Sequence, residues 1–160
     1  MQMKRLVCSF ILLSSLGLGL LQAAEGFAGT WKLNVAQSKF AKGHELKDES
    51  VVIAEQGDNR VVTVKGTDGA GKPISAKYTV PSAGGTQNYT EGAPPAGAGA
   101  IVVSKRVDAN TLDSTSTLNG KVVRTQHTVL SADGKTLTQT VSYMDEKGPA
   151  TKGVLVMNRQ

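Results

Sequence analysis

Turn-forming residues interrupt this chain so often that most of it has room only for short β-strands. Asn119-Gly120 is the strongest short hairpin signal a sequence offers, and Thr67–Lys72 and Ala132–Lys135 carry the related Asp-Gly pair. The segments between such turns are rich in Val, Ile and Thr, which favour extended backbone. No stretch keeps apolar residues at helical spacing for about three turns. The pattern predicts an all-β domain.

We expect about ten strands with connections of about two to six residues. Connections this short exclude parallel pairing, which needs a crossover of a dozen or more residues. An open meander would leave exposed edges that promote aggregation. The sequence therefore predicts a closed or nearly closed antiparallel meander barrel of about 8–10 strands. The expected strands cover residues 27–34, 49–56, 60–66, 74–80, 86–90, 100–107, 111–118, 121–130, 136–144 and 153–159, with 35–48 irregular or briefly helical.

The N-terminus has the pattern of a targeting segment. Lys4 and Arg5 precede an apolar stretch, Leu6–Leu21, which ends in small residues that suit cleavage after Ala23 or Ala24. An uncleaved anchor would need about 20 apolar residues to span a bilayer, and this stretch is shorter. We expect residues 1–24 to be a signal peptide and residues 25–160 to form the exported domain, in the periplasm or outside the cell, with no stable membrane span after cleavage.

Composition narrows the chemistry of the domain. The only cysteine, Cys8, lies in the targeting segment, so the domain has no disulfide, thiolate nucleophile or cysteine metal ligand. The formal charge is +5, but Lys and Arg are scattered, so we expect no nucleic-acid partner. His44 and His127 are the only histidines, and no metal-binding pattern or nucleophile elbow is present. We expect no catalytic residues, no metal and no cofactor, and the chain is not predicted to be an enzyme.

Alternation along the strands divides inward from outward side chains. In the strand of His127 the two faces are almost equally apolar, and we take the His127 face as inward. This choice places Arg124 outside, on solvated surface, although Arg106 and Arg124 are otherwise candidates for pairing a ligand carboxylate. Buried polar groups need partners or water, so the mixed interior leaves a wet cavity and a filled core both open. The inward faces are Ile74, Ala76, Tyr78 and Val80; Leu112, Ser114, Ser116 and Leu118; Val123, Thr125, His127 and Val129; and Leu137, Gln139, Val141 and Tyr143.

The first strand of the domain carries a family signature. Gly29-Thr30-Trp31 resembles the Gly-x-Trp of lipocalins and their calycin relatives, in which the Trp plugs one end of the barrel and a basic residue near the last strand covers it. Arg159 is placed to be that residue. The wider run Phe27–Phe40 (FAGTWKLNVAQSKF) resembles the opening of a family of small exported bacterial lipocalin-like proteins of uncharacterised function. Further pieces of this resemblance are Gly66–Tyr78, Lys105–Thr111 and Ser131–Leu137, whereas Pro81–Gly99 departs from the pattern and leaves barrel closure open on that side.

The resemblance implies a function as well as a fold. Lipocalin-like proteins commonly hold a small, largely apolar molecule inside the barrel. On this basis Tyr78, His127 and Tyr143 are the inward polar residues expected to orient such a ligand, while Gly29, Trp31 and Arg159 are assigned to the fold. The alternative is a non-catalytic envelope or interaction protein with a filled barrel and no small ligand. The sequence does not identify protein partners.

Overall fold

The computed structural model describes residues 26–144 and 151–160. The predicted signal peptide, residues 1–24, lies outside this range. No helix within the range has the length and apolar character needed to cross a membrane. The described residues form eleven strands and one short 3-10 helix: β1 (Gly29–Leu33), η1 (Val35–Gln37), β2 (Leu46–Gln56), β3 (Asn59–Asp68), β4 (Pro73–Pro81), β5 (Gly84–Thr86), β6 (Asn88–Glu91), β7 (Ile101–Arg106), β8 (Thr111–Leu118), β9 (Lys121–Leu130), β10 (Thr136–Tyr143) and β11 (Thr151–Arg159).

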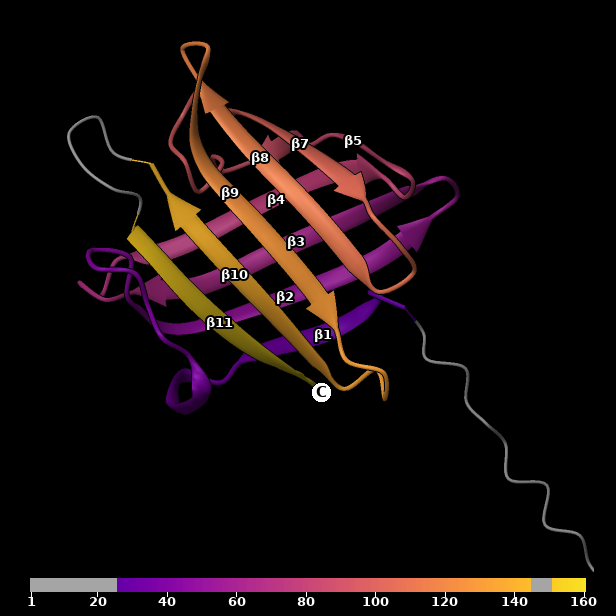
Figure 1. The fold of residues 1–160 in the computed structure, drawn as a ribbon, viewed down its shortest axis with the longest axis horizontal. Helices are drawn as coiled ribbons and strands as arrows, with labels where there is room; N and C mark the ends of the chain where they lie inside the picture. The colour runs from indigo at the N-terminus through magenta and orange to yellow at the C-terminus, as the bar shows by residue number, and fades with distance from the viewer. Residues whose placement is uncertain (1–25, 145–150) are drawn as a thin grey trace, which may run out of the picture.

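All of these strands belong to one antiparallel sheet that curls into a nearly closed barrel. Its order, β5-β7-β8-β9-β10-β11-β1-β2-β3-β4-β6, is a meander closed by pairing of the first strand with the last. Trp31 on β1 lies opposite Arg159 on β11, and Leu33 lies opposite Met157. Figure 1 shows β7 to β11 in front, crossing over β1 to β4 behind. The predicted all-β meander barrel is confirmed.

The barrel has one unsealed seam, between the edge formed by β4 and β6 and the edge formed by β7 and β5. The predicted strand at 86–90 is in fact two short strands, because the chain crosses the seam there. β5 pairs with β7 and β6 pairs with β4, so residues 84–91 join the two edges. Gly84 has φ +107, and a Cβ there would lie 2.8 Å from the Ser104 carbonyl oxygen. Glycine in this segment thus allows close approach to β7, which explains its loose composition.

One end of the barrel is plugged by Trp31, which is fully buried. Its indole Nε1 donates a hydrogen bond to the carbonyl of Phe27, 3.0 Å away. The Arg159 guanidinium lies 4.3 Å above the indole ring and donates to the carbonyls of Gly26, Ala28 and Gly134. We call this the plugged end. The core around it consists of Phe27, Trp31, Leu33, Val51, Val62, Leu130, Leu137 and Met157.

Gly29 completes the plugged end. Its φ is +131, and a Cβ at this position would lie 2.5 Å from Nη1 of Arg159. Only glycine adopts this conformation without strain. The Gly-x-Trp pattern therefore has a local physical cause, because the glycine makes room for the arginine that covers the tryptophan two residues later.

The predicted faces are right for β4, β8 and β10 and wrong for β9. A regular two-residue turn at Asn119-Gly120 would pair Ser116 with Val123. A bulge shifts the register, so that Ser116 pairs with Arg124 and Ser114 with Gln126. Cross-strand partners share a face, and one extra residue reverses every side chain beyond it. Arg124 consequently points into the barrel, whereas His127, predicted inward, is exposed on the outer surface.

Candidate ligand-binding cavity

A cavity of about 760 Å³ occupies the interior of the barrel. Protein pockets of about 300–1,000 Å³ are typical for small-molecule ligands. The interior is hollow, so a filled core, which the sequence left open as an alternative, is wrong. The apolar part of the wall is mainly aliphatic and includes Val51, Ile53, Val62, Val64, Val80, Val102, Leu112, Leu137, Val141 and Leu155.

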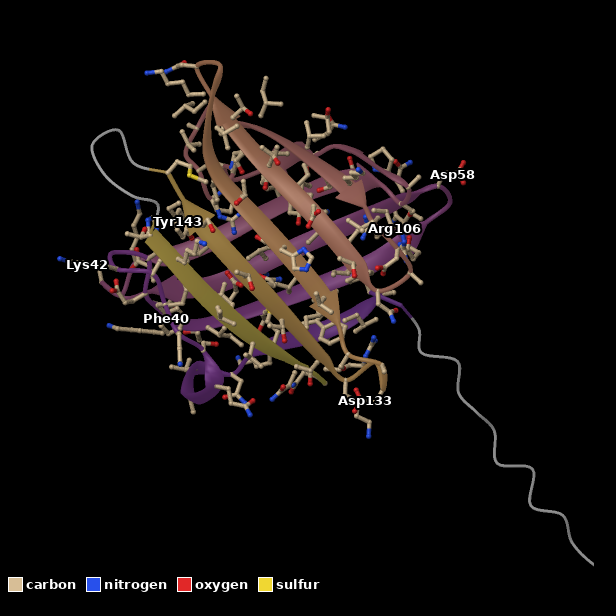
Figure 2. All side chains as sticks on the ribbon, viewed as in Figure 1. Phe40, Lys42, Asp58, Arg106, Asp133 and Tyr143 are labelled. Atoms are coloured by element: carbon tan, nitrogen blue, oxygen red, sulfur yellow. The ribbon has the colours of Figure 1, made fainter. Side chains whose placement is uncertain are left out.

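The cavity runs from the plugged end to a mouth at the opposite end of the strands. Figure 2 places Asp58 and Arg106 at one end of the barrel and Lys42 and Tyr143 at the other. The Arg106 guanidinium lies 5.5 Å from the ring centre of Phe27, so its end is the plugged one. At the mouth the rings of His44 and Tyr143 stack 3.5 Å apart and almost parallel. The mouth is therefore narrowed by an aromatic pair.

A polar band follows the inner face of β9. The Arg124 Nη2 donates to Oε1 of Gln126 at 2.5 Å, and Gln126 Nε2 donates to Oγ1 of Thr128 at 3.0 Å. The Arg124 guanidinium also lies 5.6 Å from the ring centre of Tyr143. All four side chains line the cavity. The β9 bulge is what turns this band inward.

A second polar group crosses the seam. The Tyr89 hydroxyl donates to Oε1 of Gln87 at 2.9 Å, and Gln87 Nε2 donates to Oγ of Ser104 at 2.9 Å. The Ser104 hydroxyl in turn lies 2.9 Å from that of Ser114. These hydrogen bonds connect β6 to β7 across the seam, where the two strands do not pair, and they continue to β8. The same side chains also present hydroxyl and amide groups to the cavity.

Two buried arginines in the cavity wall are only partly satisfied. Arg60 is 3% exposed and Arg124 is 7% exposed, and neither Nε has a hydrogen-bond partner within the described part of the chain. The Arg60 guanidinium lies 5.9 Å from the ring centre of Phe27, at the plugged end. Burying a charged donor without a partner is costly. Such donors in a cavity wall are suited to a ligand that accepts hydrogen bonds.

Glu49 is an acidic residue of the cavity wall whose pKa is affected by the charge of Arg124. Burial raises the pKa of its carboxyl to about 7, despite the opposing charge of Arg124, and the neighbouring Asp48 raises it further. The ion pairs within the described residues are Lys77–Glu91 and His127–Asp113. The Glu49 carboxyl therefore lies beyond salt-bridge distance of Arg124. At neutral pH Glu49 is therefore balanced between its neutral and charged forms, and it changes state in response to small changes in nearby charge.

The tyrosines of the wall stay neutral. Burial raises the pKa of the Tyr89 hydroxyl to about 12 and raises that of Tyr78 still further. Their rings lie 4.8 Å apart. At the mouth, burial and the charge of Arg124 lower the pKa of His44. The hydroxyls of Tyr78 and Tyr89 thus act as neutral hydrogen-bonding groups at physiological pH.

The predicted ligand residues are only partly brought together. Tyr78 and Tyr143 line the cavity, as the alternation of β4 and β10 indicated. His127 does not, because the β9 bulge turns it outward, where its Nδ1 lies 2.6 Å from Oδ1 of Asp113.

The sequence analysis missed Glu49, Arg60, Gln87 and Tyr89 as cavity residues. A signal existed for two of them. Glu49 is in phase with Val51 and Ile53 along β2, and Arg60 is in phase with Val62 and Val64 along β3.

Comparison with known proteins supports no family assignment. No protein-family model and no curated protein matches the sequence. Among solved structures, zebrafish ileal bile acid-binding protein complexed with cholic acid is 14% identical with a TM-score of 0.47, over 84% of this chain and 98% of its own. Lobster apocrustacyanin A1 is 9% identical with a TM-score of 0.42, over 83% of this chain and 60% of its own. Rv2717c from M. tuberculosis is 16% identical with a TM-score of 0.42, over 83% of this chain and 92% of its own.

Similarities this low transfer no ligand, activity or partner to this chain. The fold is established by its own features instead. The meander closes between β1 and β11, and Trp31 plugs one end beneath Arg159. The protein is a lipocalin-like barrel, as the resemblance of its first strand implied.

Proposed function

We propose that this protein binds a small, largely apolar molecule inside its barrel. The observation that carries the proposal is the cavity of about 760 Å³, whose wall combines aliphatic side chains with polar groups that face the interior. That combination is the usual composition of a small-molecule site, in which apolar walls supply affinity and a few polar groups fix orientation. Tyr78 and Tyr143 belong to the polar groups that orient the ligand.

The proposed activity is binding and not catalysis. Within the described residues no group of three or more His, Cys, Asp or Glu side chains is arranged to hold a metal ion. His127 pairs with Asp113 on the outer surface, away from the cavity. The polar groups of the cavity wall include arginine, amide and hydroxyl side chains and the carboxyls of Glu45, Glu49 and Asp68, which together suit recognition by hydrogen bonding.

We further propose that binding takes place after export. The support is the N-terminal pattern of two basic residues, an apolar stretch and small residues at the cleavage point. Fusing residues 1–24 to a reporter enzyme that is active only outside the cytoplasm tests this directly. Reporter activity that disappears when the apolar stretch is interrupted by charged residues supports export, and unchanged activity contradicts it.

Titration with an environment-sensitive fluorescent probe tests the binding function. A neutral naphthylamine probe added to residues 25–160 should gain fluorescence to saturation at one molecule per barrel. Val64→Trp places bulk into the cavity from β3 and should abolish the gain, because the wall lies directly against the ligand space.

Thr63→Trp is the matched control, since it adds the same ring one position away on the opposite face of β3. It should leave probe binding intact. Equal loss of fluorescence in both variants, or no saturable signal in the native protein, contradicts a binding role for the cavity.

A further inference from the structure

The two partly satisfied arginines lie at opposite ends of the cavity. Arg60 contacts Phe27 at the plugged end, whereas Arg124 lies beside Tyr143 at the mouth. Tyr143 in turn stacks on His44, which fixes the position of Arg124 at the mouth. Along β3 the wall runs from Arg60 to Gly66, and these six positions span about 20 Å at about 3.3 Å per residue.

Neither arginine is neutralised by a close acidic partner. The acid next to Arg60 across the strand pair is Glu55, and its carboxylate accepts a hydrogen bond from Ser82 at 2.8 Å. Neither Arg60 nor Arg124 takes part in a salt bridge within the described residues. Burial lowers the pKa of Arg60, and the charge of Arg106 lowers it further, although Glu55 opposes both effects. The wall of the cavity therefore carries positive charge at each end.

On β2 and β3 the wall between the two arginines is apolar, whereas β9 adds the polar side chains of Gln126 and Thr128. Val62 and Val64 occupy the inward positions of β3 between Arg60 and Gly66, and Val51 and Ile53 do so on β2. Tyr78 lies in this middle zone, because it pairs with Val62 of β3 and lines the cavity. A guanidinium is a planar fork of donors that matches a carboxylate geometrically. A ligand that complements this wall has a hydrogen-bond acceptor at each end and an apolar part between them.

We propose that the cavity binds an elongated molecule with an apolar middle and an oxyanion, such as a carboxylate, at each end. One oxyanion pairs with Arg60 at the plugged end and the other with Arg124 at the mouth. This inference rests on the proposed binding function and names the ligand class. Each oxyanion supplies acceptors to the Nε that lacks a partner.

An anion can bind at the mouth beside Glu49 because the Glu49 carboxyl can be protonated. A charged carboxylate at this place would repel the incoming oxyanion, but its protonated form donates a hydrogen bond instead. Because the pKa of Glu49 is about 7, protonation costs little free energy near neutral pH.

Calorimetric titration with one matched series tests the proposal. The series is dodecanedioate, its monomethyl ester and its dimethyl ester, repeated with hexadecanedioate, so that charge changes while chain length does not. The native protein should bind each diacid about tenfold more tightly than its monoester, and the monoester about tenfold more tightly than the diester. Arg60→Met and Arg124→Met should each bind diacid and monoester equally.

Two controls separate lost binding from lost folding. Arg60→Gln retains polarity without charge and should remove the preference for the diacid, while its thermal melt stays cooperative. Lys105→Met removes an exposed cation from the outer face of β7 and should leave every affinity unchanged.

The outcomes distinguish this inference from the proposed function. Diacids of both lengths binding no more tightly than their monoesters would overturn the two-ended ligand, and so would unchanged selectivity in both arginine-to-methionine variants. A protein that still binds the neutral naphthylamine probe in that case retains its binding function. Failure to bind the probe and every member of the series would overturn both.

Discussion

The arginine that covers the plug and the two buried arginines of the cavity wall differ in how far their donors are satisfied. Arg159 lies over Trp31 and donates to three backbone carbonyls, from Gly26, Ala28 and Gly134. Arg60 and Arg124, in the cavity wall, each keep an Nε without a partner within the described residues. The first arginine stabilises the fold, whereas the other two have binding capacity left over. The proposed binding site is therefore the part of the barrel where these polar groups remain unsatisfied.

The largest expected effect is on the plug. Trp31→Ala should lower the free energy of unfolding by about 3–5 kcal/mol, because a fully buried indole leaves a cavity. Tyr143→Ala, at the partly exposed mouth, should cost about 1 kcal/mol or less. Urea denaturation of both variants measures the difference. Equal losses would mean that the two ends do not differ as described.

Glu49 should make the hollow part sensitive to pH. Its pKa is raised from 4.5 to about 7, so the folded protein binds more protons than the unfolded chain between these values. The free energy of unfolding of the native protein should then fall as pH rises through this window. Glu49→Gln should not show this fall, a difference on the order of 2–3 kcal/mol. Arg124, Asp48 and Tyr78 are the charged or titratable groups that act on this carboxyl.

Thermal melts at a series of pH values test this prediction. The stability advantage of Glu49→Gln should grow from about pH 4.5 to about pH 7 and then level off. An advantage that stays constant across this range would place the carboxyl in water, outside the cavity wall.

Replacing Arg159 and replacing Arg124 should change the free energy of unfolding in opposite directions. Arg159→Met should lower the free energy of unfolding by about 2 kcal/mol, because three partly buried carbonyls lose a charged donor. Arg124→Met should raise it by about 1 kcal/mol, because a buried, partly satisfied charge is replaced by an apolar chain. Chemical denaturation in the absence of ligand compares them. Destabilisation by both substitutions to the same extent would assign Arg124 to the fold.

The smallest expected effect concerns two glycines of the plugged end. Gly29→Ala should cost about 1 kcal/mol more than Gly26→Ala. Both positions have positive φ, but only at Gly29 does a Cβ meet the Arg159 guanidinium, whereas nothing lies within 4 Å at Gly26. Melting temperatures of the two variants are sufficient to compare them. The reverse order would remove the steric account of the Gly-x-Trp pattern.

The plugged end was predictable from the sequence because its determinants are local. Gly29 and Trp31 are two residues apart, and the turn-rich pattern requires the meander that brings Arg159 to them. The faces of β4, β8 and β10 followed from simple alternation for the same reason. The seam lies beside the glycine-rich departure at Pro81–Gly99, which the sequence had marked as the weak side.

The cavity was less predictable because its key residues break local rules. A bulge opposite Ser116 and Thr117 reverses β9, and no residue pattern at Val123 announces it. This one insertion moved Arg124 inside and His127 outside. Arg60 and Glu49 were missed for another reason, since charged residues near strand ends are usually solvated. Only their phase with the valines beside them marks them as inward.

Native mass spectrometry of the protein purified from its own host, followed by solvent extraction, shows whether the barrel carries a ligand. We predict one co-purifying molecule per barrel, elongated and acidic at both ends, which Val64→Trp excludes and Thr63→Trp retains. A protein that carries nothing, and that also fails to bind the neutral probe and the diacid series, would contradict the assignment of this barrel to small-molecule binding.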